Sequence, residues 1–279
     1  MKSLLFSLLL AATYGLCCQQ AAAQTPAQCE LAGLKLVRHQ ANQLFKQQDY
    51  ATALEQLTEF QKRCSREMYD LLRQPEHTSD YYWLQSDIMA AQLKTQAYSQ
   101  CISSGTQMLY GWMSKLQEMP DTRVHRAISY NLKQCQSQFE QPYAIDKLSQ
   151  TACPVNGFTG TLISQQADTT ICLSPQLNQQ YDDMVERDRD PAAQFELLTQ
   201  QGTEQQRQPI TIGSGRLADM DLCGVDTTSA GIVNGRTIVR LQGGTGFCHP
   251  GNASFIYDGF FELKQGQLVL LDEALSPVH

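Results

Sequence analysis

The stretch "CELAGLKLVRHQANQLFKQQDYATALEQLTEFQKRC" (residues 29–64) places two apolar stripes between two cysteines. Apolar residues recur in it at spacings of three and four, at Leu34, Val37, Ala41 and Leu44 and again at Ala53, Leu57, Phe60 and Cys64. This spacing predicts two amphipathic helices. The polar segment KQQDY (46–50) separates them at the midpoint between Cys29 and Cys64, so antiparallel helices of equal length bring the cysteines level. We therefore predict a helical hairpin closed by a Cys29–Cys64 disulfide.

Apolar spacing and the midpoint between two cysteines predict a second helical hairpin further along the chain. One apolar stripe comprises Cys101, Gly105, Met108, Trp112 and Leu116, and another comprises Val124, Ile128, Leu132 and Cys135. The segment EMPDT (118–122) separates them, because Pro120 ends a helix and Asp121 or Thr122 can cap the next one. The midpoint of the two cysteines again falls at this break, which predicts a Cys101–Cys135 bridge.

The first 23 residues are expected to be a signal peptide. Lys2 precedes an uncharged apolar run over residues 3–18, and the small residues AAA (21–23) follow at the cleavage position. We expect the mature chain to begin at Gln24, to be exported, most simply to a bacterial periplasm, and to hold no transmembrane helix. Cys17 or Cys18 as the lipid-bearing residue of an envelope lipoprotein is an open alternative.

Eight cysteines remain in the mature chain, an even number that is typical of a disulfide framework in an exported protein. Besides the two hairpin bridges, we expect Cys153–Cys172 and Cys223–Cys248. None of these cysteines has the close spacing of a zinc site, so no metal and no cofactor are expected.

Charge narrows the class of partner. The chain carries a formal charge of −7 and has no run of Lys or Arg, and loss of Lys2 with the signal peptide makes it −8. Nucleic acids and anionic membranes attract clustered basic side chains, so neither is an expected partner.

The first hairpin resembles a tetratricopeptide repeat over residues 34–67. Ala41 and Ala53 stand at the two small positions, Leu44 and the pair Asp49-Tyr50 fit the pattern, and Leu57 and Phe60 are the following large residues. Val37 replaces an expected aromatic residue and Ser65 an expected proline. The segment AYSQCI (97–102) echoes DYATAL (49–54) at an offset of 48 residues, not the 34 of a regular array. The resemblance implies that a groove of the helical half binds a protein segment.

Composition changes near residue 150, where Pro, Gly, Asn and Thr become frequent. Branched and aromatic residues then predict strands over 160–164, 169–173, 209–212, 235–242, 253–263 and 267–273. Asn234-Gly235 and the segment KQGQ (264–267) predict hairpin turns. Ser174-Pro175 and Asp190-Pro191 predict helices over 175–187 and 191–201. The expected fold class is α+β in two domains, with a disulfide-stapled antiparallel helical domain over 24–149 and an α+β domain with a mostly antiparallel sheet over 150–279.

The segment GGTGFCHPGN (243–252) is the most conspicuous candidate for chemistry. It is followed by Pro250-Gly251, and no Lys follows before Lys264, so it does not match a phosphate loop. His249 points away from Cys248 if the backbone is extended. We therefore expect a corner closed by Cys248 and name no catalytic residue. A hydrolase or thiol enzyme that uses Cys248 with His249, or acids such as Asp219, Asp221 and Asp258, stays the alternative.

The expected function is that of a non-enzymatic exported binding or scaffold protein that engages a protein, peptide or envelope partner. Tyr81, Tyr82 and Trp83 are the candidate partner-binding residues, because three consecutive rings on a helix cannot all face one core. The sequence does not indicate an oligomeric state.

Overall fold

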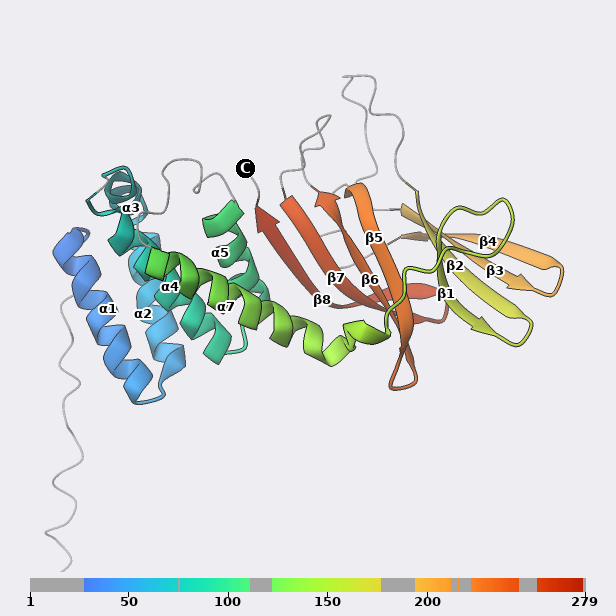
Figure 1. The fold of residues 1–279 in the computed structure, drawn as a ribbon, viewed down its shortest axis with the longest axis horizontal. Helices are drawn as coiled ribbons and strands as arrows, with labels where there is room; N and C mark the ends of the chain where they lie inside the picture. Colours follow the sequence, from blue (N-terminus) through green and yellow to red (C-terminus); the bar gives the residue numbers. More distant parts are fainter. Residues whose placement is uncertain are drawn as a thin grey trace, which may run out of the picture.

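The computed structural model describes residues 28–74, 76–110, 122–176, 194–211, 215, 222–245 and 255–277. Within these ranges, no helix combines the length and the apolar character needed to span a bilayer. The helices occupy the N-terminal half and two antiparallel four-stranded sheets occupy the C-terminal half, as the α+β class predicts (Figure 1).

The helical half consists of stacked helices that run back and forth. In chain order they are α1 (Leu31–Lys46), α2 (Tyr50–Arg63), α3 (Ser65–Leu72), α4 (Thr78–Lys94), α5 (Tyr98–Tyr110) and α7 (Thr122–Glu140). Two short 3-10 turns, η1 (Gln141–Tyr143) and η2 (Ile145–Lys147), then lead to the sheets. Helix α4 lies in the middle and packs against α1, α2, α5 and α7.

The hairpins α1–α2 and α4–α5 are structural copies of one another. Each has a three-residue connection, and its central residue, Gln48 or Gln96, adopts a left-handed conformation with φ of 62°. Tyr50 and Tyr98 begin the second helix of each copy, and the Lys94 ammonium lies 6.0 Å from the centre of the Tyr50 ring. Helix α3 is inserted between the copies, which explains why their offset exceeds that of a regular repeat.

Three of the predicted disulfides are present. The bridges are Cys29–Cys64, Cys101–Cys135 and Cys153–Cys172, with Cα–Cα distances of 5.1, 6.1 and 5.7 Å. The fourth expected bridge, Cys223–Cys248, involves Cys248 and the side chain of Cys223, which lie outside the described residues.

The two sheets follow the chain order. The distal sheet contains β1 (Thr161–Gln166), β2 (Thr169–Gln176), β3 (Gln194–Gln201) and β4 (Glu204–Thr211), and the proximal sheet contains β5 (Leu222–Val233), β6 (Arg236–Thr245), β7 (Phe255–Lys264) and β8 (Gln267–Pro277). The sheets share an apolar core that includes Leu173 and Phe195 from the distal sheet and Val239 and Phe261 from the proximal one.

Both predicted hairpin turns are confirmed. Asn234 and Gly235 have φ of 52° and 76°, and Gln265 and Gly266 have φ of 52° and 74°. Two consecutive left-handed residues define the type I′ turn that matches the twist of antiparallel strands. Each turn therefore fixes the register of the strands that it joins.

The helix predicted over 191–201 is wrong, since residues 194–201 form strand β3. The strand lies between β2 and β4, and Phe195 and Leu197 face one core while Leu198 faces another. The apolar residues of β3 are few and do not alternate strictly, and periodicity cannot distinguish such a short group from part of a buried helix. Of the helix predicted over 175–187, residues 175 and 176 end strand β2, and the rest lie outside the described residues.

The helical core continues onto the proximal sheet. Along β6 and β7 the side chains alternate, so that Ile238 and Phe260 join the core of the helical half while Val239 and Phe261 face the distal sheet. Helix α5 packs directly against β8. The division into two domains at residue 149 stays a prediction, and the shared core binds the two halves together.

Candidate binding surface on helix α7

The three aromatic residues predicted to bind a partner are mostly inside the protein. Tyr82 is fully buried and Tyr81 exposes 7% of its surface, so neither ring is available to a partner, which corrects that part of the prediction. The reason is the central position of α4, whose neighbours cover most of its circumference. Burial, and to a lesser extent the neighbouring Tyr82 phenol, raise the pKa of Tyr81 to about 12.

Trp83 is half-buried and already has neighbours. The Arg38 guanidinium of α1 lies 5.9 Å from the centre of its ring and donates from Nε to Asp87 Oδ2 at 2.6 Å. Burial raises the pKa of the Asp87 carboxyl, and Arg38 opposes this shift. The ion pair therefore fastens α1 to α4 and covers one side of the Trp83 ring.

Helix α7 is held against the helical half by its buried face. Cys135 is bonded to Cys101 of α5, and the Asn131 amide donates to the Ser86 carbonyl of α4 at 3.1 Å. Val124 and Ile128 lie on the same face and are fully buried. Helix α7 is thus fixed to two neighbouring helices along its length.

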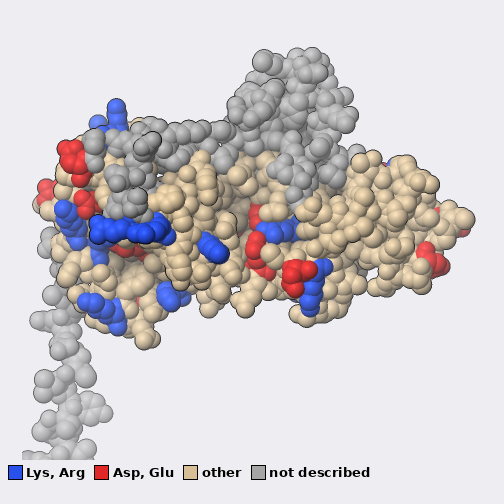
Figure 2. Space-filling view, viewed as in Figure 1, with Lys and Arg blue, Asp and Glu red and all other residues tan. Residues whose placement is uncertain are grey.

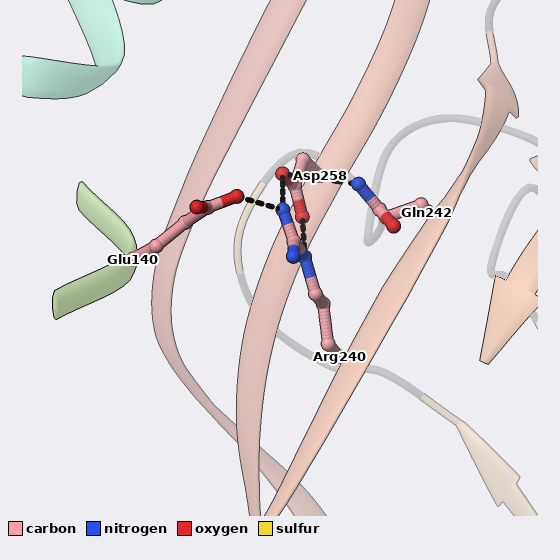
Figure 3. A network of polar contacts seen from close by, with 4 residues as sticks. All are labelled: Glu140, Arg240, Gln242 and Asp258. Atoms are coloured by element: carbon pink, nitrogen blue, oxygen red, sulfur yellow. Dashed lines mark hydrogen bonds and ion pairs between the residues drawn. The ribbon is translucent and has the colours of Figure 1, made fainter. Parts of the chain in front are cut away.

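The C-terminal end of α7 is fixed to the proximal sheet. Arg240 of β6 donates from Nη2 to Glu140 Oε1 at 2.6 Å and to Asp258 Oδ2 of β7 at 2.7 Å, and its Nε donates to Asp258 Oδ1 at 2.9 Å (Figure 3). The Gln242 amide also donates to Asp258, at 3.3 Å. Because Arg240 exposes only 12% of its side chain, its charge depends on these two carboxylates.

Aromatic rings also pack at the contact between the C-terminal end of α7 and the proximal sheet. The ring of Tyr143 lies parallel to that of Phe260 at a centroid distance of 4.0 Å, and the Arg240 guanidinium lies 5.1 Å from the Phe260 centroid. Phe139, near the end of α7, contacts Phe260 as well, at 5.4 Å. Burial, with the nearby Asp272 charge, raises the pKa of the Tyr143 phenol to about 12, although Arg236 opposes the shift.

The opposite face of α7 is open to solvent. Arg126, Tyr130 and Lys133 are spaced by four and three residues, which places them on one side of the helix. Tyr130 exposes 62% of its surface and the two basic residues are exposed. Within the described part of the chain, neither Arg126 nor Lys133 forms an ion pair or a side-chain hydrogen bond. We call these three residues the α7 face. Figure 2 shows Lys and Arg side chains gathered over the helical half on this side of the molecule.

A hollow of about 510 Å³ continues the α7 face toward the sheets. Its lining comes from the last turns of α7 and from η1 and η2, and comprises Lys133, Gln136, Ser137, Glu140, Gln141, Ala144, Ile145 and Asp146. Ala144 has a left-handed backbone with φ of 44°, which turns the chain sharply and forms the far wall. Ile145 exposes 37% of its surface there and gives the hollow an apolar patch.

The structure describes only one of the residues considered for the enzyme alternative, Asp258. The described residues contain no group of three His, Cys, Asp or Glu side chains able to hold a metal ion. Asp258, one of the acids considered for catalysis, is occupied by Arg240 and Gln242. Cys248, His249, Asp219 and Asp221 lie outside the described residues.

The α7 face is not predicted from the apolar stripe of the same helix, which identifies only the buried side. The signal lies in the complementary positions, where Arg126, Tyr130 and Lys133 repeat with helical spacing on the side away from Val124 and Ile128. An aromatic residue at a position that the pattern assigns to solvent is the kind of residue that often marks an interface.

No protein-family model matches this chain, and neither a curated protein nor a solved structure matches it significantly. The function proposed below therefore rests on the geometry of the chain itself.

Proposed function

We propose that this protein is an exported, non-enzymatic binding protein, located in a bacterial periplasm, that engages a segment of another protein through the α7 face and the adjoining hollow. The observation that carries the proposal is the 62% exposed Tyr130 on a helix fixed from behind. Tyr130 lies between two basic side chains that have no ion-pair partner among the residues that the structure describes. Three intramolecular disulfides support export, because such bonds persist in oxidising compartments.

Rigidity of α7 is what makes its outer face suited to binding. The helix is bonded to α5 by a disulfide, to α4 by a hydrogen bond and to the sheet by an ion pair. A side chain on such a support loses little backbone freedom when a partner docks, so more of the contact free energy remains as affinity. Tyrosine adds a large contact area at a low cost in side-chain entropy.

The two copied hairpins support the same role. The resemblance of the first hairpin to a tetratricopeptide repeat implies a scaffold that presents helices to a protein segment, and α7 stands where a third copy would begin. In place of that copy's second helix, the chain continues through η1 and η2 toward the sheets. The series of helical hairpins therefore ends at α7, whose last turns line the hollow beside the α7 face.

Site-specific photo-crosslinking in the producing cell tests the proposal. A photo-reactive phenylalanine analogue replaces Tyr130 in one variant and Tyr110 in another, since Tyr110 exposes a similar 65% of its surface but lies at the end of α5. We expect a defined adduct with another protein from position 130 and none from position 110. Absence of an adduct at position 130, or the same adduct from both positions, would overturn the proposal.

A further inference from the structure

We infer that the segment bound by the α7 face is acidic and extended, with two carboxylates about 10 Å apart. This inference rests on the proposed function and adds the chemistry of the partner. Arg126 and Lys133 are seven residues apart on one side of α7, and a helix rises about 1.5 Å per residue, which gives the spacing of the two cations. In an extended segment that rises about 3.1 Å per residue with three residues per turn, residues i and i+3 lie on the same side at nearly that distance.

The charges around α7 favour an acidic partner over any other. The helix carries Arg123, Arg126 and Lys133 and a single acid, Glu140, which Arg240 engages. Elsewhere in the described chain, several basic side chains are matched to acids, as in Arg38–Asp87, Arg236–Glu262 and Arg207–Glu196. Because the whole chain has a charge of −7, an acidic partner is repelled at long range and needs a local basic surface of this kind.

Tyr130 lies between the two cations and supplies the contact that charge alone does not. Its ring exposes 62% of its surface, so a side chain between the two acids of the partner can cover it. Ion pairs at an exposed surface contribute little and are screened by salt, whereas a covered aromatic ring excludes water and is a frequent hot spot. In the α7 face, Tyr130 thus anchors the partner segment, and Arg126 and Lys133 fix the position of that segment along the helix.

The hollow limits how far the acidic stretch extends. Beyond Lys133 the lining includes Glu140 and Asp146, together with the half-exposed Ile145. A third acid in line with the first two would meet carboxylates there. The partner segment is therefore expected to have acidic residues at positions i and i+3, with an uncharged or apolar residue after the second acid.

Fluorescence anisotropy with the oxidised mature chain tests this chemistry. The probe is a fluorescein-labelled dodecapeptide with glutamates at positions i and i+3 followed by leucine, and the comparison peptide has lysines in place of the glutamates. We expect the acidic peptide to bind at low salt and to be released as salt rises, and the lysine peptide not to bind. Failure of the acidic peptide to bind, or equal binding of an oligodeoxythymidylate of the same length, would overturn the inference.

Charge-reversal variants locate the site. Arg126→Glu combined with Lys133→Glu is expected to weaken binding of the acidic peptide about tenfold or more, and Tyr130→Ala several-fold. The matched control is Lys46→Glu combined with Lys62→Glu, which makes the same change of net charge at exposed positions of α1 and α2. The control is expected to stay within about twofold of the parent. An equal loss in the control would mean that net charge alone governs binding and would overturn the inference.

The crosslinked adduct tests the proposed function and the partner chemistry separately. If position 130 captures a protein through an acid-rich segment, the proposed function and the partner chemistry both stand. If the captured segment has no acids, the partner chemistry is overturned and the proposed function stands. If position 130 captures nothing, the proposed function fails.

Discussion

At the scale of single residues, Arg240 has the largest structural consequence among the residues described. Its guanidinium spans the carboxylates of Glu140 and Asp258 and lies over the Phe260 ring, so it joins a helix and two strands. A planar, multi-donor cation suits this position, because it satisfies two acids and stacks on an aromatic face at once. A lysine at the same place offers a point charge without the stacking plane.

Replacing Arg240 by methionine is therefore expected to lower the free energy of unfolding by about 2–3 kcal/mol. The variant leaves Glu140 and Asp258 facing each other, with their side chains only 25% and 21% exposed. Loss of one member of a fully buried pair costs about 3–5 kcal/mol, and partial exposure here reduces that figure. Urea unfolding followed by circular dichroism measures the change.

The control for this variant is Arg236→Met on the same strand. Arg236 also contacts a carboxylate, Glu262, at 2.7 Å, but it exposes 48% of its side chain. An exposed pair of this kind contributes little to stability, because water and salt screen it. If both substitutions cost the same, the junction around Arg240 has no special role in holding α7 to the sheet.

At the scale of elements, the sequence predicts what is local and amphipathic. The helical hairpins and the disulfides Cys29–Cys64 and Cys101–Cys135 follow from apolar spacing and from midpoints between cysteines. Both type I′ turns follow from Asn234-Gly235 and Gln265-Gly266. Strand β3 was not predicted, because Phe195 and Leu197 face one core and Leu198 faces another, so its apolar residues do not alternate strictly. Nor does spacing indicate that Glu140 meets Arg240, since that contact joins residues 100 positions apart.

The connections of the two helical hairpins offer a test at this scale. Gln48 and Gln96 are exposed and adopt φ of 62°, a conformation in which a Cβ atom is unfavourable and glycine is not. Gln48→Gly and Gln96→Gly are each expected to raise the free energy of unfolding by up to about 1 kcal/mol, because relief of the left-handed strain outweighs the extra freedom of the unfolded chain.

The same substitution inside a helix has the opposite sign. Gln43→Gly, at an exposed position within α1, is expected to lower the free energy of unfolding by about 1 kcal/mol, because glycine is a poor helix former. Thermal unfolding of the three variants measures both effects in one series. If Gln48→Gly and Gln96→Gly destabilise the protein, the left-handed backbone at these two positions is not strained.

At the scale of the whole molecule, the proximal sheet is the middle one of three layers. The helices cover one side of the proximal sheet, and the distal sheet packs on its other side (Figure 1). The proximal sheet therefore takes part in the core on each side through alternate residues of the same strands, such as Phe260 and Phe261. Because residues of the proximal sheet belong to the core of the helical half and to the core shared with the distal sheet, we expect the described chain to unfold as one cooperative unit.

Phe260→Ala tests that cooperativity, because the residue is fully buried in β7 yet packs among residues of the helical half. Loss of a buried phenylalanine costs about 3–5 kcal/mol. The chain has two tryptophans, Trp83 in α4 and Trp112, so in a Trp112→Phe background tryptophan fluorescence reports on the helical half alone. We expect the fluorescence transition and the transition in far-ultraviolet circular dichroism to shift together to lower urea. A fluorescence midpoint that stays where it was, while circular dichroism shows an earlier loss of structure, would mean that the helical half folds independently of the sheet that it covers.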